Sequence, residues 1–370
     1  MILPKSNRIV RQKTIACPLF FAGTGLHTGI HVSVELLPAP ENHGVVFSRA
    51  DLPGEPLIPA LAEFVTNTNR GTTLEKGGVS VSTVEHLLAA LNATEIDNLL
   101  VKLSGPELPI LDGSAQEYAV RLKECGATLQ NASKTYYTPE KEIFFSGDNG
   151  SWIKIVPSDE LSFELTVDFG STAVGLQRAE WGREIDFVSE VAPARTFVSL
   201  SDVIPLLKAG LIRGGALENA IVVVDRTPSR EEHSLLSQRY SGEISAEIEK
   251  GYLNPGGLRF ENECARHKLI DMIGDFFLVG KTLKARIIAN KSGHKINTTV
   301  ANIMRNELLK NSEDHIPFYD PGAEPVYDIN AIKKLLPHRP PFLMVDRITE
   351  ITSESVTGVK CVGINEGFFI

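Results

Sequence analysis

The sequence predicts an α+β protein, and three observations support this fold class. The chain has 370 residues, which is enough for two domains and part of a third, each with its own core. Segments with the alternation of strands and segments with helical periodicity follow one another without a fixed repeat. No run of apolar residues approaches the ~18 that a membrane-spanning helix needs. A globular protein with mixed secondary structure is therefore expected.

Charge and cysteine content narrow the setting. The net charge of −9 argues against nucleic acid or an anionic membrane as the main partner, but it allows a local basic pocket for a phosphorylated small molecule and transient contact with a membrane surface. The four cysteines show no CxxC spacing, which predicts reduced, buried thiols and no disulfide frame. The first 20 residues lack the apolar core and cleavage site of a signal peptide. The predicted location is cytoplasmic.

The elements can be placed in order along the chain. Residues 30–37 are strand-like, and residues 82–91 and 115–125 have helical patterns. Residues 130–149 are polar and rich in turn formers, so we place a domain boundary there, between residues 1–135 and 136–310. Strands resume at residues 152–169, where alternation is clear.

A helix predicted over residues 262–279 carries a polar stripe. His267, Asp271 and Asp275 are spaced i, i+4, i+8 and share one side of this helix. The opposite side is apolar and contains Ala265, Leu269, Met272, Ile273 and Phe276. The stripe is either a solvated polar face or, if a second domain covers it, part of a metal site.

The segment around His86 also has two interpretations. Ser82 and Glu85 have the spacing of a capping box, in which Glu85 would bond back to the Ser82 amide. Alternatively, Glu85 is a general base beside His86, a metal ligand. His294 is expected on a loop after a strand-like segment and a turn, where it is either a proton-transfer group or an exposed histidine. His86, His267 and Asp271 together could bind one Zn²⁺, as in metal-dependent hydrolases.

Residues 193–225 predict a strand–helix–strand unit whose helix is apolar on more than one side. This helix is either buried in a core, or it lines an apolar passage for an acyl chain.

Many motifs in this chain occur in the order found in one known family. They are GTGLHTG (23–29), STVEHLLAAL (82–91), EIDN (95–98), ELPILDGSA (107–115), ARTF (194–197), GGALENAIVVVD (214–225), GLRFENECARHKLIDMIGD (257–275) and NKSGH (290–294). Over residues 8–303 the sequence resembles UDP-3-O-acyl-N-acetylglucosamine deacetylase, a zinc enzyme of lipid A synthesis. The resemblance implies two similar domains, each a two-layer α/β sandwich, enclosing a zinc site.

The resemblance also implies roles for individual residues. His86, His267 and Asp271 would bind zinc, and Glu85 would activate water. His294 would protonate the departing glucosamine nitrogen.

Further roles concern the substrate. Thr196 would donate its hydroxyl to the developing oxyanion, Lys268 would supply positive charge, and Asp275 would support His294. Phe197 would hold the nucleotide end. The acyl passage would be formed by the insert at about 193–225, with Leu206, Leu207 and Gly215. The products would be acetate and the UDP-3-O-acyl-glucosamine.

Two features depart from the family pattern. Gly71 stands where many members have a cysteine near the site. Residues 227–255 form a longer, charged segment than compact members have, and we interpret it as a surface insertion without an assigned role.

The last segment resembles a different family. After an acidic, proline-containing linker at 311–325, the sequence LPHRPPFLMVDR (336–347) is similar to the opening of a 3-hydroxyacyl-acyl-carrier-protein dehydratase with a hot-dog fold. This implies a bifunctional parent protein in which residues 326–370 are an incomplete dehydratase fragment, with a helix followed by a hairpin. We expect no dehydratase activity from it, and acyl carrier protein would be a partner only of an intact dehydratase half.

Two other functions remain open. The chain could sequester a nucleotide-lipid without cleaving it, but an intact set of candidate site residues weighs against this. It could instead hydrolyse another N-acyl sugar, which the apolar 193–225 unit disfavours.

Overall fold

The structure is a computed structural model that describes residues 10–170, 174–210, 213–240, 251–313, 322–351 and 356–362. The chain divides into two compact units, Met1–Asn306 and Glu307–Ile370. Each unit is described by itself below.

The first half of the large unit is built on a five-stranded sheet. The strands are, in spatial order, β2 (Leu19–Thr24), β3 (His31–Pro38), β9 (Leu99–Leu103), β4 (Val45–Arg49) and β5 (Leu57–Pro59). All neighbours are antiparallel except β4 and β9, which run parallel. Helix α1 (Glu85–Thr94) precedes β9 in the chain, and α2 (Gln116–Cys125) follows it.

The second half repeats this arrangement. Its sheet has the order β12 (Ile143–Ser146), β13 (Trp152–Pro157), β20 (Ala285–Asn290), β14 (Ser162–Asp168) and β15 (Leu176–Gly182). Again a single pair, β14 and β20, is parallel. Helix α6 (Glu263–Phe277) precedes β20 and α7 (His294–Glu313) follows it. The α+β class is confirmed, and the two halves have the same strand order and strand directions.

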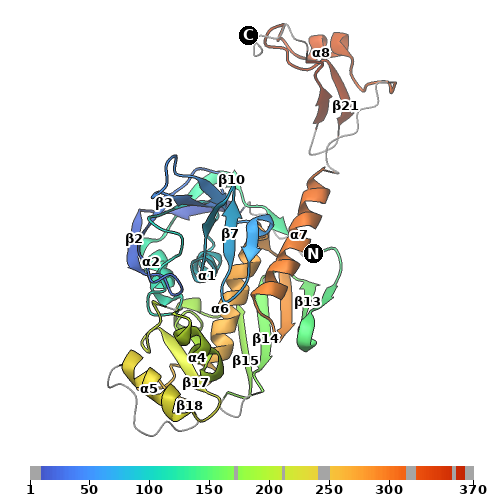
Figure 1. Cartoon of the computed structure of the whole chain (residues 1–370). Coiled ribbons are helices and arrows are strands. Elements are labelled where there is room, and N and C mark those ends of the chain that lie inside the picture. Colours follow the sequence, from blue (N-terminus) through green and yellow to red (C-terminus); the bar gives the residue numbers. More distant parts are fainter. Residues whose placement is uncertain are drawn as a thin grey trace. The chain divides into compact units, whose positions relative to one another are not determined.

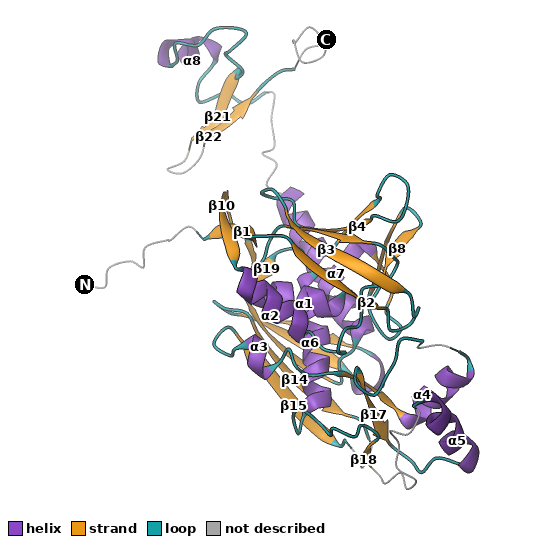
Figure 2. Ribbon diagram, turned by 90° about the vertical axis from the view of Figure 1, so that its left-hand side faces the viewer, coloured by secondary structure: helices purple, strands orange, loops and turns teal. Residues whose placement is uncertain are grey.

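The helices lie between the two sheets (Figure 2). Helix α6 packs on β14 and β15, and α1 packs on both α2 and α6. The predicted alternation in β14 explains this packing, because Phe163, Leu165 and Val167 all point inward and are buried. Phe163 lies against Phe276 of α6, with ring centroids 5.9 Å apart. The helix faces that meet between the sheets therefore belong to the interior.

Each half contains an insertion that precedes the helix packed between the sheets, α1 in the first half and α6 in the second (Figure 1). In the first half this is a small sheet of β6 (Val65–Asn67), β7 (Thr73–Lys76) and β8 (Val79–Val81). In the second half it contains β16 (Thr196–Ser199), α4 (Leu200–Lys208), β17 (Ala220–Val224), α5 (Arg230–Arg239) and β18 (Gly251–Tyr252). Strands β16 and β17 are parallel, as the strand–helix–strand pattern predicts. Residues 211–212 and 241–250 lie outside the described residues.

Short elements complete the large unit. Strand β1 (Arg11–Ile15) pairs with β10 (Ala127–Ser133), and β11 (Tyr136–Tyr137) pairs with β19 (Thr282–Leu283). The remaining elements are α3 (Phe187–Glu190) and the 3₁₀ turns η1 (Ala62–Phe64) and η2 (Asp148–Gly150). The segment 130–149 is thus not only a turn, because parts of it pair as strands on both sides of the predicted boundary.

The prediction of buried thiols is wrong for two cysteines. Cys264 is buried and Cys125 is half-buried, but Cys17 and Cys361 are exposed. Cys17 and Cys125 lie together, with their sulfur atoms 2.9 Å apart. Composition carries no information on burial, and these cysteines are at the ends of elements rather than in their apolar faces.

The small unit contains α8 (Ile329–Leu335) and an antiparallel hairpin of β21 (Arg347–Ile351) and β22 (Val356–Val359). The expected helix and hairpin are therefore present. The predicted linker begins too early, because α7 continues to Glu313, and residues 314–321 lie outside the described residues. Within the described ranges, no helix combines the length and apolar character that crossing a bilayer requires.

Candidate metal and catalytic site

His86, His267 and Asp271 meet where α1 packs on α6. The candidate ligand atoms of these buried residues all lie within 4.8 Å of one another. Nε2 of His267 is 3.4 Å from Oδ1 of Asp271, and Nε2 of His86 is 3.9 Å from the same oxygen. The stripe on α6 is thus not a solvated face, since α1 of the other half covers it.

The start of α1 is not a capping box. The N-cap is Val84, and the Ser82 hydroxyl donates to the carbonyl of Pro106. The Glu85 carboxylate instead accepts a hydrogen bond from the backbone N–H of Thr72, at 3.0 Å. Glu85 is therefore held by the small sheet of the first half, with its side chain in the site.

The two helices approach closely at Gly274 of α6. A Cβ atom on this residue would lie 2.1 Å from the backbone oxygen of Glu85. No larger residue fits unless α1 moves. A second glycine, Gly71, has a φ of 155°, and its Cβ would be 3.1 Å from Oε1 of Glu85. The position where relatives were expected to have cysteine thus faces the candidate base.

His294 is held by a buried hydrogen-bond network. It was expected on a loop, but it is the first residue of α7. Its Nδ1 lies 3.0 Å from Oδ2 of Asp275, as expected from the sequence. Asn297 donates to the same oxygen at 2.9 Å, and the Thr72 hydroxyl donates to Oδ1 at 2.6 Å. Nε2 of His294 faces the site, 4.0 Å from Glu85 and 3.6 Å from Asp271.

Burial and charge separate the protonation states of these groups. Burial raises the pKa of Glu85 to about 7, although His294 acts in the opposite direction. Burial lowers the pKa of His86 to about 3, with a contribution from His267. Burial likewise lowers the pKa of His267. Near neutral pH both imidazoles are therefore uncharged, with lone pairs available to a metal.

The remaining charged groups stabilise one another. Burial opposes the ionised form of Asp271, but Lys268 and the nearby histidines hold the pKa of this carboxyl well below its usual range. Burial also opposes the charged form of His294, but Asp275 and Asp271 outweigh it and raise the pKa to about 9. Lys268 donates to Asp271 at 2.8 Å, and this contact raises the lysine pKa despite burial.

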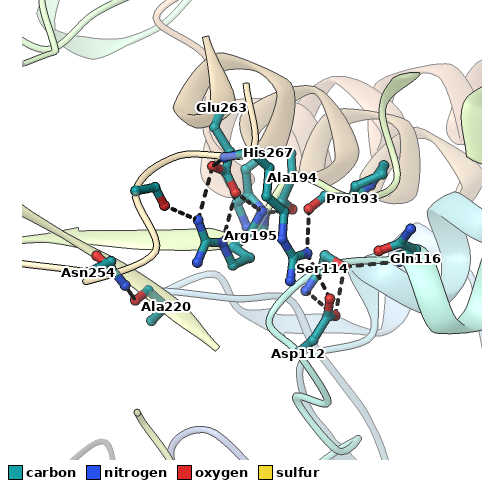
Figure 3. Close-up of polar contacts among 12 residues, drawn as sticks. Asp112, Ser114, Gln116, Pro193, Ala194, Arg195, Ala220, Asn254, Glu263 and His267 are labelled. Carbon is teal, nitrogen blue, oxygen red and sulfur yellow. Dashed lines mark hydrogen bonds and ion pairs between the residues drawn. The ribbon is translucent and has the colours of Figure 1, made fainter. Parts of the chain in front are cut away.

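An ion pair fixes β16 to the first turn of α6. Arg195 and Glu263 are both buried, and Nε of the arginine is 3.0 Å from Oε1 of the glutamate (Figure 3). Next to this pair, Nδ1 of His267 lies 3.1 Å from the carbonyl oxygen of Ala194. This contact orients the imidazole so that Nε2 faces Asp271, which is how protein groups commonly orient metal-binding histidines.

The glycine-punctuated loop 23–29 is held by Glu107. Its carboxylate accepts hydrogen bonds from the backbone N–H groups of His27 and Thr28 and from the Thr83 hydroxyl. A Cβ atom at Gly25 would collide with this carboxylate at 2.4 Å. Glu107 thus joins the loop to the segment that leads into α1.

A cavity of about 630 Å³ opens from this cluster toward the second-half insertion. Glu85, His86, His267, Lys268, Asp271 and His294 line one part of it, together with Thr196 and Phe197. Leu206 of α4 and Gly215 line the part within the insertion. Leu207 was expected to line the acyl passage. It instead packs against the hydrophobic cluster of the insertion that contains Leu206, and it is not among the described residues that line the cavity.

Sequence reasoning missed Thr72, Glu107, Gly274 and Asn297. Gly274 had a usable signal, since a glycine in a helix costs about 1 kcal/mol relative to alanine and usually has a packing reason. Asn297 lies one turn after His294 on the same helix, a spacing that places both on one face. Thr72 and Glu107 carry no local signal, because their partners are distant in the chain.

The donor set fits a zinc ion. Two neutral imidazoles and one ionised carboxylate are the type of ligands that catalytic zinc sites use, and three protein ligands leave one coordination position for water or substrate. Glu85, Asp271 and His294 form a second group whose ligand atoms are equally close. Within the described residues, these two overlapping groups form one candidate metal site.

Comparison with known proteins identifies relatives along nearly the whole chain. The bifunctional enzyme LpxC/FabZ of Bacteroides thetaiotaomicron is 44% identical over 362 residues, covering 98% of this chain and 78% of the relative. Its namesake in Porphyromonas gingivalis is 42% identical over 360 residues, covering 97% and 78%. UDP-3-O-acyl-N-acetylglucosamine deacetylase of Myxococcus xanthus is 40% identical over 288 residues, covering 77% and 83%. A family model described as UDP-3-O-acyl N-acetylglycosamine deacetylase matches residues 12–245 and 237–306, and the chain belongs to this family.

Proposed function

We propose that the chain removes the N-acetyl group from UDP-3-O-acyl-N-acetylglucosamine, releasing acetate and leaving a free amine on the sugar. The observation that carries this proposal is the convergence of His86, His267 and Asp271 beside Glu85 and His294, in the lining of a cavity that also has apolar walls. The proposal also rests on the family to which the chain belongs.

His86, His267 and Asp271 are the proposed zinc ligands. Zinc bound there would lower the pKa of a water molecule and polarise the acetyl carbonyl. The protein's part is to hold the ligands in place through the Ala194 carbonyl and Lys268.

Glu85 is the proposed general base. Its Oε2 is fixed by the Thr72 amide, so Oε1 is the oxygen that can accept the proton of the attacking water. A carboxylate with a pKa of about 7 is well matched to this task near neutral pH.

His294 is the proposed general acid. Asp275 binds Nδ1 and keeps the imidazole charged, so Nε2 carries the proton that the departing sugar nitrogen needs. Since Glu85 and His294 face each other at 4.0 Å, one site contains both a proton acceptor and a proton donor.

The cavity walls fit the rest of the substrate. Thr196 and Lys268 both line the cavity, and they are proposed to supply a hydroxyl donor for a developing oxyanion and positive charge. Phe197 is proposed to hold the nucleotide end, and the apolar wall that includes Leu206 is proposed to take the acyl chain. A cytoplasmic location, a bifunctional parent protein and acyl carrier protein as a partner of the intact dehydratase half belong to the same proposal.

The test is acetate release from UDP-3-O-acyl-N-acetylglucosamine, measured on the chain as purified, after chelation, and after zinc is returned. We expect release to disappear on chelation and to return with zinc. Binding of the substrate without release, with zinc present, would favour the sequestering function instead. Equal release from an N-acetyl sugar that lacks the 3-O-acyl chain would favour a hydrolase of other sugars.

A further inference from the structure

The charged segment at 227–255 has no role in the proposed reaction, but one residue of its described part, Tyr240, lines the cavity. The two matches to the family model meet at residues 237–245, inside this segment. Helix α5, which ends at Arg239, belongs to it and is followed by Tyr240. The described part of the segment therefore belongs to the same insertion as Leu206 and Gly215, which line the cavity.

Helix α5 is anchored at both ends. At its start, Ser229 and Glu232 form a capping box, and Arg226 binds Glu232 through two contacts of 2.7 Å. Arg226 also donates to the Ser201 hydroxyl of α4. At the other end, Arg239 donates to the carbonyl of Gly215 at 2.7 Å. The cavity-lining residue Gly215 is thus tied directly to α5.

These anchors place Tyr240 in the cavity wall. The ring is only 7% exposed and packs in the cluster that contains Leu206, Val222 and Leu253. Leu206, Val222 and Tyr240 line the same cavity that contains the candidate metal ligands. The guanidinium of Arg239 lies 5.5 Å from the centre of the Tyr240 ring, a cation–π contact that helps to fix the ring. An aromatic ring fixed in this way sets how much space an apolar occupant has.

We propose that Tyr240 is a specificity-determining residue that limits the bulk of the acyl chain accepted by the cavity. The proposal rests on the proposed function, since the occupant is taken to be the 3-O-acyl group of the substrate. A side chain at position 240 that is smaller than tyrosine leaves space for longer or branched acyl chains. A side chain larger than tyrosine reduces that space. In an apolar pocket, each methylene group changes kcat/KM by about tenfold or more.

The experiment compares substrates with straight acyl chains of increasing length, each with a counterpart carrying a terminal methyl branch. The variants Tyr240→Ala and Tyr240→Trp change the wall in opposite directions, and Tyr240→Phe keeps its shape. For Tyr240→Ala we expect the ratio of kcat/KM for the bulkiest to the smallest chain to rise by about tenfold or more. For Tyr240→Trp the ratio should fall, and for Tyr240→Phe it should stay unchanged.

Leu253→Ala is the matched control. Leu253 has the same 7% exposure and belongs to the same cluster, but it is not among the described residues lining the cavity. This variant should lower stability without changing the ratio. An unchanged ratio in both Tyr240→Ala and Tyr240→Trp, or an equal shift in Leu253→Ala, would overturn the proposal.

A binding measurement separates this proposal from the proposed function. Calorimetric titration with free 3-hydroxy fatty acids of increasing length reports on the cavity without any deacetylation. If the unaltered chain releases no acetate but the preferred fatty acid still changes with residue 240, the proposed reaction is wrong and the role of Tyr240 in limiting chain bulk stands. If acetate is released but neither the kcat/KM ratio nor the fatty-acid preference responds to residue 240, only the role proposed for Tyr240 is wrong.

Discussion

The two halves of the large unit share a topology but contribute different residues to the candidate site. Each has a five-stranded sheet in which the last strand enters the middle and pairs in parallel with the third, and each has a helix before and after that strand. The first half presents Glu85 and His86 in the first turn of α1. The second presents His267, Asp271 and Asp275 over successive turns of α6, and His294 at the start of α7.

The repeated framework brings α1 and α6 together, while the chemistry depends on the residues that each half adds. The small sheet of the first half positions Glu85 through Thr72, and the larger insertion of the second half builds the cavity. Neither half has a complete ligand set by itself. Variants in each half can therefore measure how much that half contributes to metal binding, catalysis and stability.

Removing a proposed zinc ligand from either half should abolish acetate release to a similar extent. His86→Ala and His267→Ala each leave two ligands, so we expect loss of retained zinc and a fall in acetate release of about 10³-fold or more, as for groups that act as a unit. Zinc content by atomic emission and acetate release check this. His43→Ala, in the first half and outside the site cavity, is the control and should keep both. Retention of zinc by His86→Ala would show that the second half suffices.

The candidate base of the first half can be tested separately from metal binding. Glu85→Gln keeps the size of the side chain and an oxygen for the Thr72 amide but cannot accept the proton, so kcat should fall by about 10²–10⁴-fold. Zinc content should be unchanged. Glu75→Gln, at an exposed position of β7, should behave like the unaltered chain. A Glu85→Gln variant with normal kcat would move the base to another residue.

Asp275 of the second half should act through His294. Because Asp275 is the main group that raises the His294 pKa, Asp275→Asn should lower that pKa from about 9. His294 would then lose its proton at lower pH, and the alkaline limb of the kcat/KM profile should move toward neutral pH. At neutral pH we expect a loss of about 10–100-fold. A lower rate with an unmoved alkaline limb would mean that Asp275 has only a structural role.

The contact between the halves should tolerate no added atom at Gly274. Gly274→Ala places a methyl group against the Glu85 backbone, and overpacking of this kind costs about 1–3 kcal/mol of unfolding free energy. Urea denaturation followed by circular dichroism measures it. Gly256→Ala is the matched control, because its Cβ would meet nothing within 4 Å, and it should stay within about 0.5 kcal/mol. Equal midpoints for the two variants would contradict the close approach.

Much of the local structure could be predicted from the sequence. The helices at α1, α2 and α6 and the alternating strand β14 are where periodicity places them, because apolar period alone decides which face turns inward. The boundaries were less certain. His294 begins a helix rather than ending a loop, and α7 extends into the predicted linker.

The candidate site could be predicted only with the family's motif order. Locally, a capping box explained Glu85 as well as catalysis did, and a solvated face explained His267 and Asp271. The structure removes these alternatives through distant partners: Thr72 takes the Glu85 carboxylate, and α1 covers the α6 stripe. A pattern within one helix contains no information about a helix about 180 residues away, so local reasoning could not choose.

The elements, the polar stripe and the set of residue types that can bind a metal could be predicted from the chain alone, since propensity and periodicity are local properties. Tertiary packing buries the stripe, keeps His86 and His267 neutral and keeps His294 charged. The physical reason is that desolvation and the nearby charges set a pKa, and both arise when the two halves pack together. Contacts within the second-half insertion place Tyr240, from a segment interpreted as a surface insertion, in the wall of the cavity.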